Sequence, residues 1–151
     1  MKNVNHIVRF CAEQCAHQRS GELSVASMFD AYTMARMFAI PSRRADRPCA
    51  PDVDVILKLA KRIEPTKNAN GFRVVPVVFQ NPGSAACNWR DVPGAVQRLL
   101  EHCDPTLEPL AFYRAFEKIH PFADGNGRLG AILFNWADLE NPINSPYVFG
   151  Q

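Results

Sequence analysis

Apolar residues recur every three or four positions along most of the chain, a spacing that predicts amphipathic helices. The pattern predicts six helices, over residues 3–17, 22–39, 51–63, 91–103, 110–119 and 127–137. The turn pairs Asn141-Pro142 and Ser145-Pro146 favour an extended tail after them. The residues expected to face the core include Val4, Ile7, Val8, Cys11 and Cys15 in the first helix, Met34 and Met37 in the second, and Leu110 and Phe116 in the fifth. The chain is therefore expected to form an all-α fold.

The helical spacing of apolar residues is interrupted between the third and fourth predicted helices. Residues 72–79 are rich in β-branched and aromatic side chains, which predicts a strand. Pro76 lacks a backbone N–H and would place that strand at an edge. A second strand would lie within residues 80–89, where Asn81-Pro82-Gly83 predicts a turn. We therefore expect a short β-hairpin over residues 72–89, which from the residues alone would be interpreted as a plain connection between helices.

Composition and charge narrow the class of protein. The length of 151 residues suits a single domain (1–151) with a hydrophobic core, and 47% apolar and 21% charged residues are ordinary for a globular protein. The net charge of +2 is too small to favour nucleic acid or an anionic membrane as a partner. No apolar run has the length of a membrane span, and no export signal is recognisable. Five scattered cysteines fit neither a disulfide framework nor a zinc motif, so we expect a cytoplasmic protein with free thiols.

The stretch His120-Pro121-Phe122-Ala123-Asp124-Gly125-Asn126-Gly127-Arg128 places polar and charged side chains between two predicted helices. Helix N-termini carry unpaired N–H groups and a positive dipole end, and glycine lets a backbone approach a phosphate closely. Gly125 and Gly127, with Asn126 between them, would form a nest of N–H groups for an anion. Arg128 offers a planar fork of donors for phosphate oxygens. The stretch therefore predicts a phosphate-binding site.

Three further residues of this stretch complete the interpretation. His120 can accept a proton near neutral pH, and Asp124 is suited to hold Mg²⁺ beside substrate phosphates. Phe122 is interpreted as an apolar anchor for the loop. A plain helical corner would also use Asp-Gly and Asn-Gly, but it gives no reason for His, Asp and Arg to share one turn with two glycines. We expect His120 to deprotonate a hydroxyl that attacks a metal-bound phosphate.

This stretch resembles the Fic motif, H-x-F-x-[D/E]-G-N-G-R-x-x-R, at every specified position except the last. The resemblance implies an all-helical Fic (Fido) domain that transfers AMP from ATP to a Ser, Thr or Tyr hydroxyl of a target protein. It implies that His120 is the general base, that Asp124 holds Mg²⁺, and that Gly125-Asn126-Gly127 with Arg128 bind the nucleotide phosphates. By analogy, a toxin, an effector or a phage-encoded protein would fit such a small core.

The family also has a flap over the active site, just before the motif helices. The resemblance places it at residues 72–89, where Phe72, Arg73, Val74 and Val75 would hold the target segment by strand-like main-chain pairing. Many relatives are inhibited by a helix with the pattern [S/T]-x-x-x-E-[G/N], and this pattern does not occur in the sequence. We therefore expect this mode of inhibition to be absent.

The last motif position holds Ala131 instead of arginine. In the family, that arginine contacts the terminal phosphate of ATP. Either another cation substitutes for it, with Arg73 and Arg90 as candidates, or the donor is a different nucleotide, or activity is weak. The alternatives to AMP transfer are a Doc-like transfer of phosphate and a Fic-fold protein that binds without catalysis.

Overall fold

The computed structural model describes residues 2–18, 20–21, 23–40, 48–77 and 86–146. It contains six α-helices in these residues, α1 (Lys2–His17), α2 (Leu23–Ala39), α3 (Val53–Ile63), α4 (Val92–His102), α5 (Pro109–Ile119) and α6 (Asn126–Phe134), with a short 3₁₀ helix η1 (Trp89–Asp91) before α4. The all-α fold expected from the sequence is confirmed. Among the described residues, no helix combines the length and apolar character that crossing a bilayer requires.

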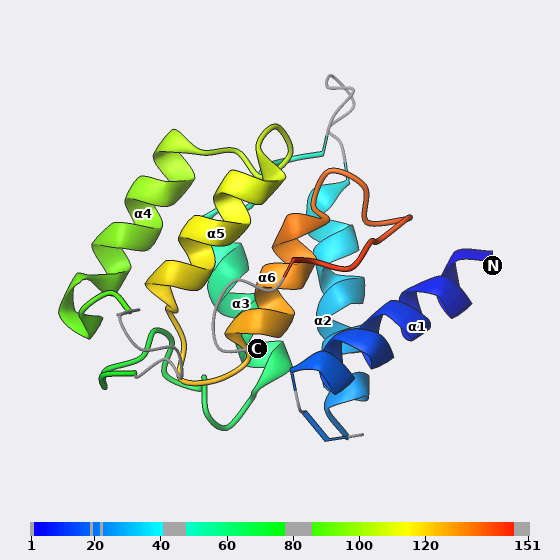
Figure 1. Ribbon diagram of the computed structural model, residues 1–151, viewed down its shortest axis with the longest axis horizontal. Coiled ribbons are helices and arrows are strands. Elements are labelled where there is room, and N and C mark those ends of the chain that lie inside the picture. Colours follow the sequence, from blue (N-terminus) through cyan, green and yellow to red (C-terminus); the bar gives the residue numbers. More distant parts are fainter. Residues whose placement is uncertain (1, 19, 22, 41–47, 78–85, 147–151) are drawn as a thin grey trace.

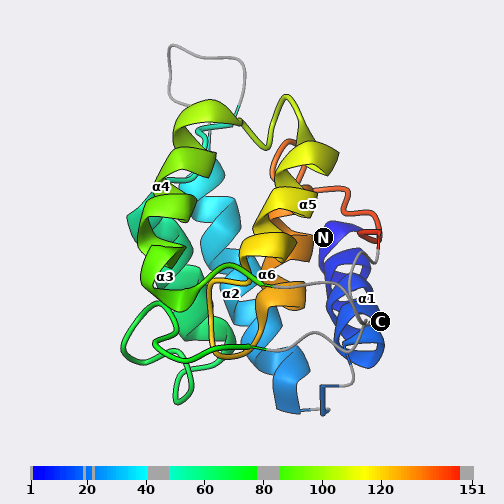
Figure 2. The same cartoon turned by 60° about the vertical axis from the view of Figure 1, so that its left-hand side comes forward.

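Helix α6 is the central element of the fold. It packs against α5, α3, α2 and α1, and Figures 1 and 2 show it between α5 and α2. Every residue from Asn126 to Leu133 is buried, including the polar Asn126 and Arg128. A helix that is covered on all sides has few positions where polar groups can reach solvent. The polar groups at its N-terminus therefore face other parts of the protein or a pocket.

The local sequence determines where helix α3, which packs beside α6, begins and ends. Asp52 caps its N-terminus, with the side chain accepting a hydrogen bond from Val55 N at 2.8 Å. Ile56, Leu59 and Ile63 are buried at helical spacing and face α2 and α6. The helix ends at Ile63, and Pro65 follows shortly after it. The turn after α3 is thereby placed beside α6.

Four residues that were expected to face the core are exposed. Val4, Val8, Met37 and Leu110 have large solvent-accessible fractions, and for them the sequence-based prediction is wrong. Val4 lies near the N-terminal end of α1, which projects beyond the other helices (Figure 1), whereas Val8 lies next to the buried Ile7 but on the exposed side of the helix. Periodicity identifies the apolar side of a helix, but it does not indicate how far the partner helix extends.

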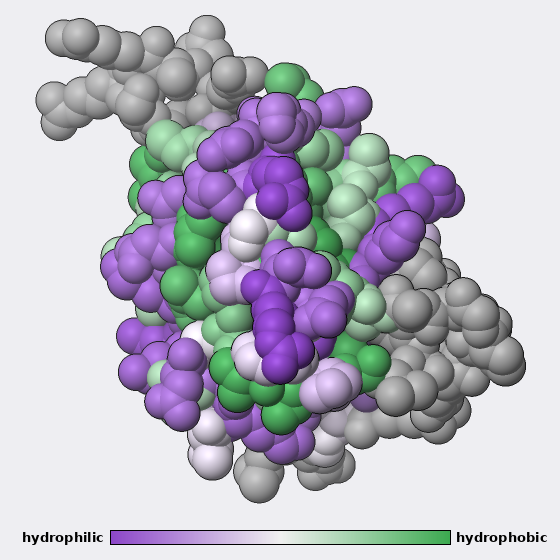
Figure 3. Space-filling model, turned by 90° about the vertical axis from the view of Figure 1, so that its left-hand side faces the viewer, coloured by the Kyte–Doolittle hydropathy of each residue, from purple (hydrophilic) through white to green (hydrophobic). Residues whose placement is uncertain are grey.

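Helix α4 forms one side of the molecule. Figure 3 views that side and shows many polar side chains with apolar ones between them. Val92 and Val96 are buried under this surface, and Leu99 packs against the core from a half-buried position. The alternation is that of an amphipathic helix with one face in contact with α5.

The expected β-hairpin is not seen as strands where the structure describes it. Residues 72–77 and 86–88 have no strand geometry, and residues 78–85 lie outside the described residues. The backbone N–H of Arg73 donates to the carbonyl of Pro121 at 2.9 Å, so this segment bonds to the loop before α6. In its described part, residues 72–77, this β-branched segment is therefore joined to the motif loop and is not part of a ladder of paired strands.

Candidate active site

The loop between α5 and α6 owes its shape to two left-handed residues. His120 ends α5 with a φ of 51°, and Gly125 precedes α6 with a φ of 80°. The side chain of Asn126 closes the loop, because it accepts from Phe122 N and donates to Phe122 O, both at 2.9 Å. Phe122 is buried and stacks on Phe72, with ring centroids 5.4 Å apart. Asn126 is thus used within the loop, which leaves its backbone N–H, and not its amide side chain, to face an anion.

A small pocket opens beside this loop. Its volume is about 120 Å³, well below that of whole-nucleotide sites and closer to the size of a phosphate group or two. Most of the motif residues singled out in the sequence meet here. The pocket is lined by Gln18, Ser20, His120, Ala123, Asp124, Gly125, Asn126, Gly127 and Arg128.

The N-terminus of α6 supplies backbone donors to this pocket. The first N–H groups of an α-helix have no acceptor within the helix, and the helix dipole favours negative charge there. The missing side chain at Gly127 lets the Gln18 side chain pack against α6, because a Cβ at this position would lie 2.1 Å from Gln18 Oε1. Gly125 is also constrained, since its φ is positive and a Cβ would lie 2.7 Å from Ile63 Cγ2. The backbone conformation therefore favours glycine at Gly125, whereas a side chain at Gly127 would displace the end of Gln18.

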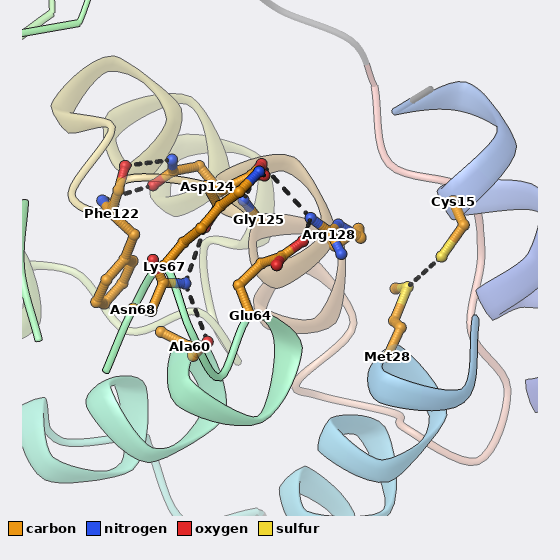
Figure 4. Close-up of polar contacts among 11 residues, drawn as sticks. Cys15, Met28, Ala60, Glu64, Lys67, Asn68, Phe122, Asp124, Gly125 and Arg128 are labelled. Atoms are coloured by element: carbon orange, nitrogen blue, oxygen red, sulfur yellow. Dashed lines mark hydrogen bonds and ion pairs between the residues drawn. The ribbon is translucent and has the colours of Figure 1, made fainter. Parts of the chain in front are cut away.

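Four side chains of alternating charge form a row of ion pairs at the motif (Figure 4), and two of them, Asp124 and Arg128, line the pocket. Lys67 Nζ lies 2.6 Å from Asp124 Oδ2, Arg128 Nη2 lies 3.5 Å from Asp124 Oδ1, and Arg128 Nη2 lies 2.7 Å from Glu64 Oε1. Burial by itself would raise the pKa of Asp124, but the hydrogen bonds from Lys67 and from Gly125 N–H lower it below its ordinary value. Asp124 is therefore ionised at neutral pH.

Arg128 has hydrogen-bonding capacity that the described residues do not use. Its side chain is only 3% exposed, and its Nη2 is paired with Glu64 and Asp124. Its Nη1 is buried and has no hydrogen-bond partner among the described residues. A buried donor without a partner is costly unless a ligand satisfies it. Because Arg128 lines the pocket, an anion there would supply the missing acceptor.

His120 is held in its neutral form. Burial, followed by the positive charge of Arg73, lowers the pKa of the imidazole to about 4, although a hydrogen bond with the Glu117 backbone and the charge of Asp124 oppose this. A neutral imidazole at neutral pH can accept a proton. A base with so low a pKa is weak in the free protein, and a bound anion nearby would raise its basicity.

Arg73 was considered as a substitute cation and as a target-binding residue, but its side chain is used elsewhere. It is 3% exposed, and its guanidinium donates to the carbonyls of His120 at 2.6 Å, Val75 at 2.9 Å, Ile119 at 3.1 Å and Cys87. Desolvation lowers the pKa of Arg73. Its donors therefore hold the backbone around the motif together and do not line the pocket.

The remaining sequence candidates also lie away from the pocket lining. Val74 and Val75 are exposed, and Phe72 is half-buried against Phe122. Arg90 lies over the ring of Trp89, with 4.4 Å between its Cζ and the ring centroid. Ala131 is fully buried within α6.

Several side chains at or near the pocket, among them Ser20, were not identified from the sequence. Glu64 and Lys67 pair with motif residues that follow them by 64 and 57 positions, and Gln18 packs against Gly127 from the end of α1. No local pattern links them to the motif. A glutamate and a lysine in the turn just after a helix are common on protein surfaces, so their role depends on where α3 packs.

Glu117, one turn before His120, is a buried carboxyl that the sequence also did not reveal. Burial raises its pKa to about 7, and its Oε1 has no hydrogen-bond partner among the described residues. The absence of a side chain at Gly130 makes room for it, because a Cβ there would lie 2.2 Å from Glu117 Oε1. The carboxyl is therefore accommodated between α5 and α6 in its neutral form.

Substituting Glu117 with glutamine should change how stability depends on pH. Between the ordinary glutamate pKa of about 4.3 and about 7, the folded protein keeps a proton that the unfolded chain has released. The free energy of unfolding of the wild type therefore falls as pH rises through this window, by up to about 3 kcal/mol. Glu117→Gln removes this dependence, so its Tm relative to wild type should increase from pH 5 to pH 8. The exposed Glu101→Gln should show no such trend, and a constant Tm difference for Glu117→Gln would contradict a neutral buried carboxyl.

Known proteins resemble this chain in sequence and in fold. A family model described as Fic/DOC family matches residues 51–137. An Aquifex aeolicus protein named "Probable protein adenylyltransferase" is 48% identical over 40 residues, which cover 26% of this chain and 12% of that protein.

Two solved structures share the fold. A Fic domain containing signaling protein from Bacteroides thetaiotaomicron gives a TM-score of 0.63 at 17% identity, over 78% of this chain and 47% of that one. Fic-1 from C. elegans gives a TM-score of 0.59 at 18% identity, over 82% of this chain and 40% of that one. At these identities the likeness concerns the fold alone, and the chain spans less than half of each of these proteins.

Proposed function

This chain belongs to the Fic/DOC family, and we propose that it transfers AMP from ATP to a Ser, Thr or Tyr hydroxyl of a target protein. The observation that best supports the proposal is the buried Arg128, whose Nη1 lacks a partner among the described residues and whose side chain lines a pocket at the N-terminus of α6. Backbone N–H groups and a guanidinium with one unpartnered nitrogen among the described residues, in one small pocket, are suited to a phosphate group.

In the proposed reaction, the target hydroxyl attacks the α-phosphorus of ATP. A bond forms between the hydroxyl oxygen and this phosphorus, the bond from the phosphorus to the oxygen that bridges to the β-phosphate breaks, and pyrophosphate leaves. The hydroxyl proton moves to the neutral imidazole of His120. Arg128 and the N–H groups of α6 hold phosphate oxygens and stabilise the charge that develops on them.

The residues of the pocket fit a divalent cation that is shared with a nucleotide. The described residues contain no group of three or more His, Cys, Asp or Glu that would hold a metal ion by themselves. Asp124 lines the pocket and is half-buried and ionised, and a carboxylate that already accepts from Lys67 and Gly125 keeps further lone pairs for a cation. Mg²⁺ beside phosphates commonly takes one or two protein carboxylates. When bound, it would neutralise phosphate charge at this position.

Because Asp124 would be the single carboxylate that binds Mg²⁺, we predict that the Tm responds to Mg²⁺ only when ATP is also present. We expect little change in Tm with Mg²⁺ alone and a clear increase with Mg²⁺ and ATP together, because the ligands must supply each other's remaining contacts. Asp124→Asn should remove the Mg²⁺-dependent part of the increase while keeping an oxygen for Gly125 N–H. Asp54→Asn, which also removes an aspartate from a lysine ion pair, should keep it. A large shift with Mg²⁺ alone would contradict shared coordination.

The type of transfer is tested by incubating the protein with Mg²⁺, cell lysate and ATP labelled at either the α- or the γ-phosphate. Label on protein from the α-phosphate only is the expected result. Label from the γ-phosphate only would replace AMP transfer with a Doc-like transfer of phosphate. The absence of label from both forms of ATP, in a protein that binds ATP, would favour a Fic-fold protein that binds nucleotide without this reaction.

A further inference from the structure

The cations at the pocket would neutralise only part of the negative charge of the nucleotide phosphates. In the row of ion pairs at the motif, the two cations Lys67 and Arg128 are balanced by the two anions Asp124 and Glu64. Arg128 is the only cation among the described residues that line the pocket, and it already shares its Nη2 with two carboxylates. A chain of phosphates brings several negative charges to this place. A second side-chain cation within reach would hold them together with Mg²⁺.

Lys67 is carried by a turn that is fixed to the motif loop. Asn68, which follows it, is 2% exposed and donates through Nδ2 to Ala60 O at 3.0 Å and to Asp124 O at 2.9 Å. These two bonds join the end of α3 to the loop before α6, as Figure 4 shows. These bonds thus hold the backbone of Lys67 close to Asp124, and they do not depend on which group the Lys67 ammonium contacts.

The ammonium of Lys67 contacts a residue of the pocket lining while its side chain remains exposed. Its side chain is 59% exposed, while its Nζ lies 2.6 Å from an oxygen of Asp124, which lines the pocket. An ion pair at this exposure contributes only about 0.2–1 kcal/mol, so its geometry is easily exchanged for another partner. A phosphate beside Asp124 would be within reach of the same ammonium after a small change of rotamer.

The size of the pocket decides which phosphates Lys67 would meet. A volume of about 120 Å³ holds a phosphate or two at the N-terminus of α6, so the remaining phosphates of ATP must lie at its mouth. Building on the proposed function, we propose that Lys67 is the second phosphate-binding cation of this site. It moves from Asp124 to the phosphates beyond the one in the pocket, and Asp124 is then available to a divalent cation. It thereby supplies a charge that Ala131 does not.

The test compares equilibrium binding of two nucleotides, measured by calorimetry with Mg²⁺. The first is an ATP analogue with a methylene group between the α- and β-phosphorus, which cannot release pyrophosphate, and the second is AMP. Lys67→Ala should raise the Kd of the ATP analogue about tenfold, as expected for one charged contact, and should change the Kd of AMP much less. Lys67→Arg should retain most of the affinity.

Lys58→Ala is the matched control. Lys58 also forms an exposed ion pair with an aspartate, at 2.7 Å from Asp54, but its ammonium lies over the ring of Phe38 and not beside the motif. This variant should bind the ATP analogue like the wild type. The comparison separates a contact with phosphate from the general loss of one positive charge.

The outcomes separate this inference from the proposed function. If the wild type binds the analogue and Lys67→Ala binds it equally well or more tightly, Lys67 is only a counter-ion of Asp124 and the inference is overturned, while AMP transfer stands. An equal loss for the ATP analogue and for AMP would also overturn it, because Lys67 would then act on the phosphate inside the pocket. If the wild type binds neither nucleotide, the proposed function and the inference both fail.

Discussion

Replacing His120 with asparagine is expected to lower the rate of AMP transfer about 10²–10⁴-fold, the range for loss of a general base. Asparagine is the appropriate substitute because His120 has a φ of 51°, and asparagine tolerates this left-handed conformation better than alanine does. The Tm and the affinity for the non-reactive ATP analogue should therefore stay close to those of the wild type. The measurement is the initial rate of label transfer from α-labelled ATP.

A second histidine provides the control for this substitution. His102 lies exposed at the end of α4, and His102→Asn should transfer label at the wild-type rate. Because burial lowers the pKa of His120 in the free protein to about 4, the wild-type kcat/KM, which reports the free enzyme, should not show a decline centred near pH 6.5. Label transfer by His120→Asn at the wild-type rate would exclude the imidazole as the base.

Replacing Arg73 with methionine is expected to lower the free energy of unfolding by about 3 kcal/mol or more. The guanidinium donates to four backbone carbonyls, from Ile119 and His120 at the end of α5 and from Val75 and Cys87. Methionine fills similar space but leaves these acceptors without a donor. For a domain of this size, the Tm should fall by about 6–12 °C, measured by calorimetry or circular dichroism.

Two further variants serve as controls for the Tm of Arg73→Met. Arg73→Lys keeps the charge but cannot reproduce the planar fork, so its Tm should lie between those of the wild type and Arg73→Met. Arg90→Met removes an exposed arginine that lies over Trp89, and its Tm should change by little. Equal Tm values for Arg73→Met and the wild type would contradict a structural role and return Arg73 to the list of ligand-binding residues.

The sequence pattern predicted those features that depend on a single helix. Periodic apolar residues predicted all six helices of the described residues, and the ends of α3 and α5 lie within a few residues of the expected positions. The side of α1 that faces the core was less well predicted, because exposure of Val4 depends on where the neighbouring helices end. The segment at Phe72 was predicted as a strand because its composition fits one, whereas its observed bonds go to the loop at Pro121.

The sequence by itself determined the family, the helical fold and the grouping of the motif residues. His120, Asp124 and Arg128 are four positions apart and share one loop and helix start, so their proximity follows from local geometry. The tertiary structure decided the partners of that loop. Lys67, which faces Asp124, and Glu64, which faces Arg128, belong to a turn far earlier in the chain, and only the packing of α3 beside α6 brings them there. Long-range ion pairs depend on how helices pack, and no spacing along the chain encodes that.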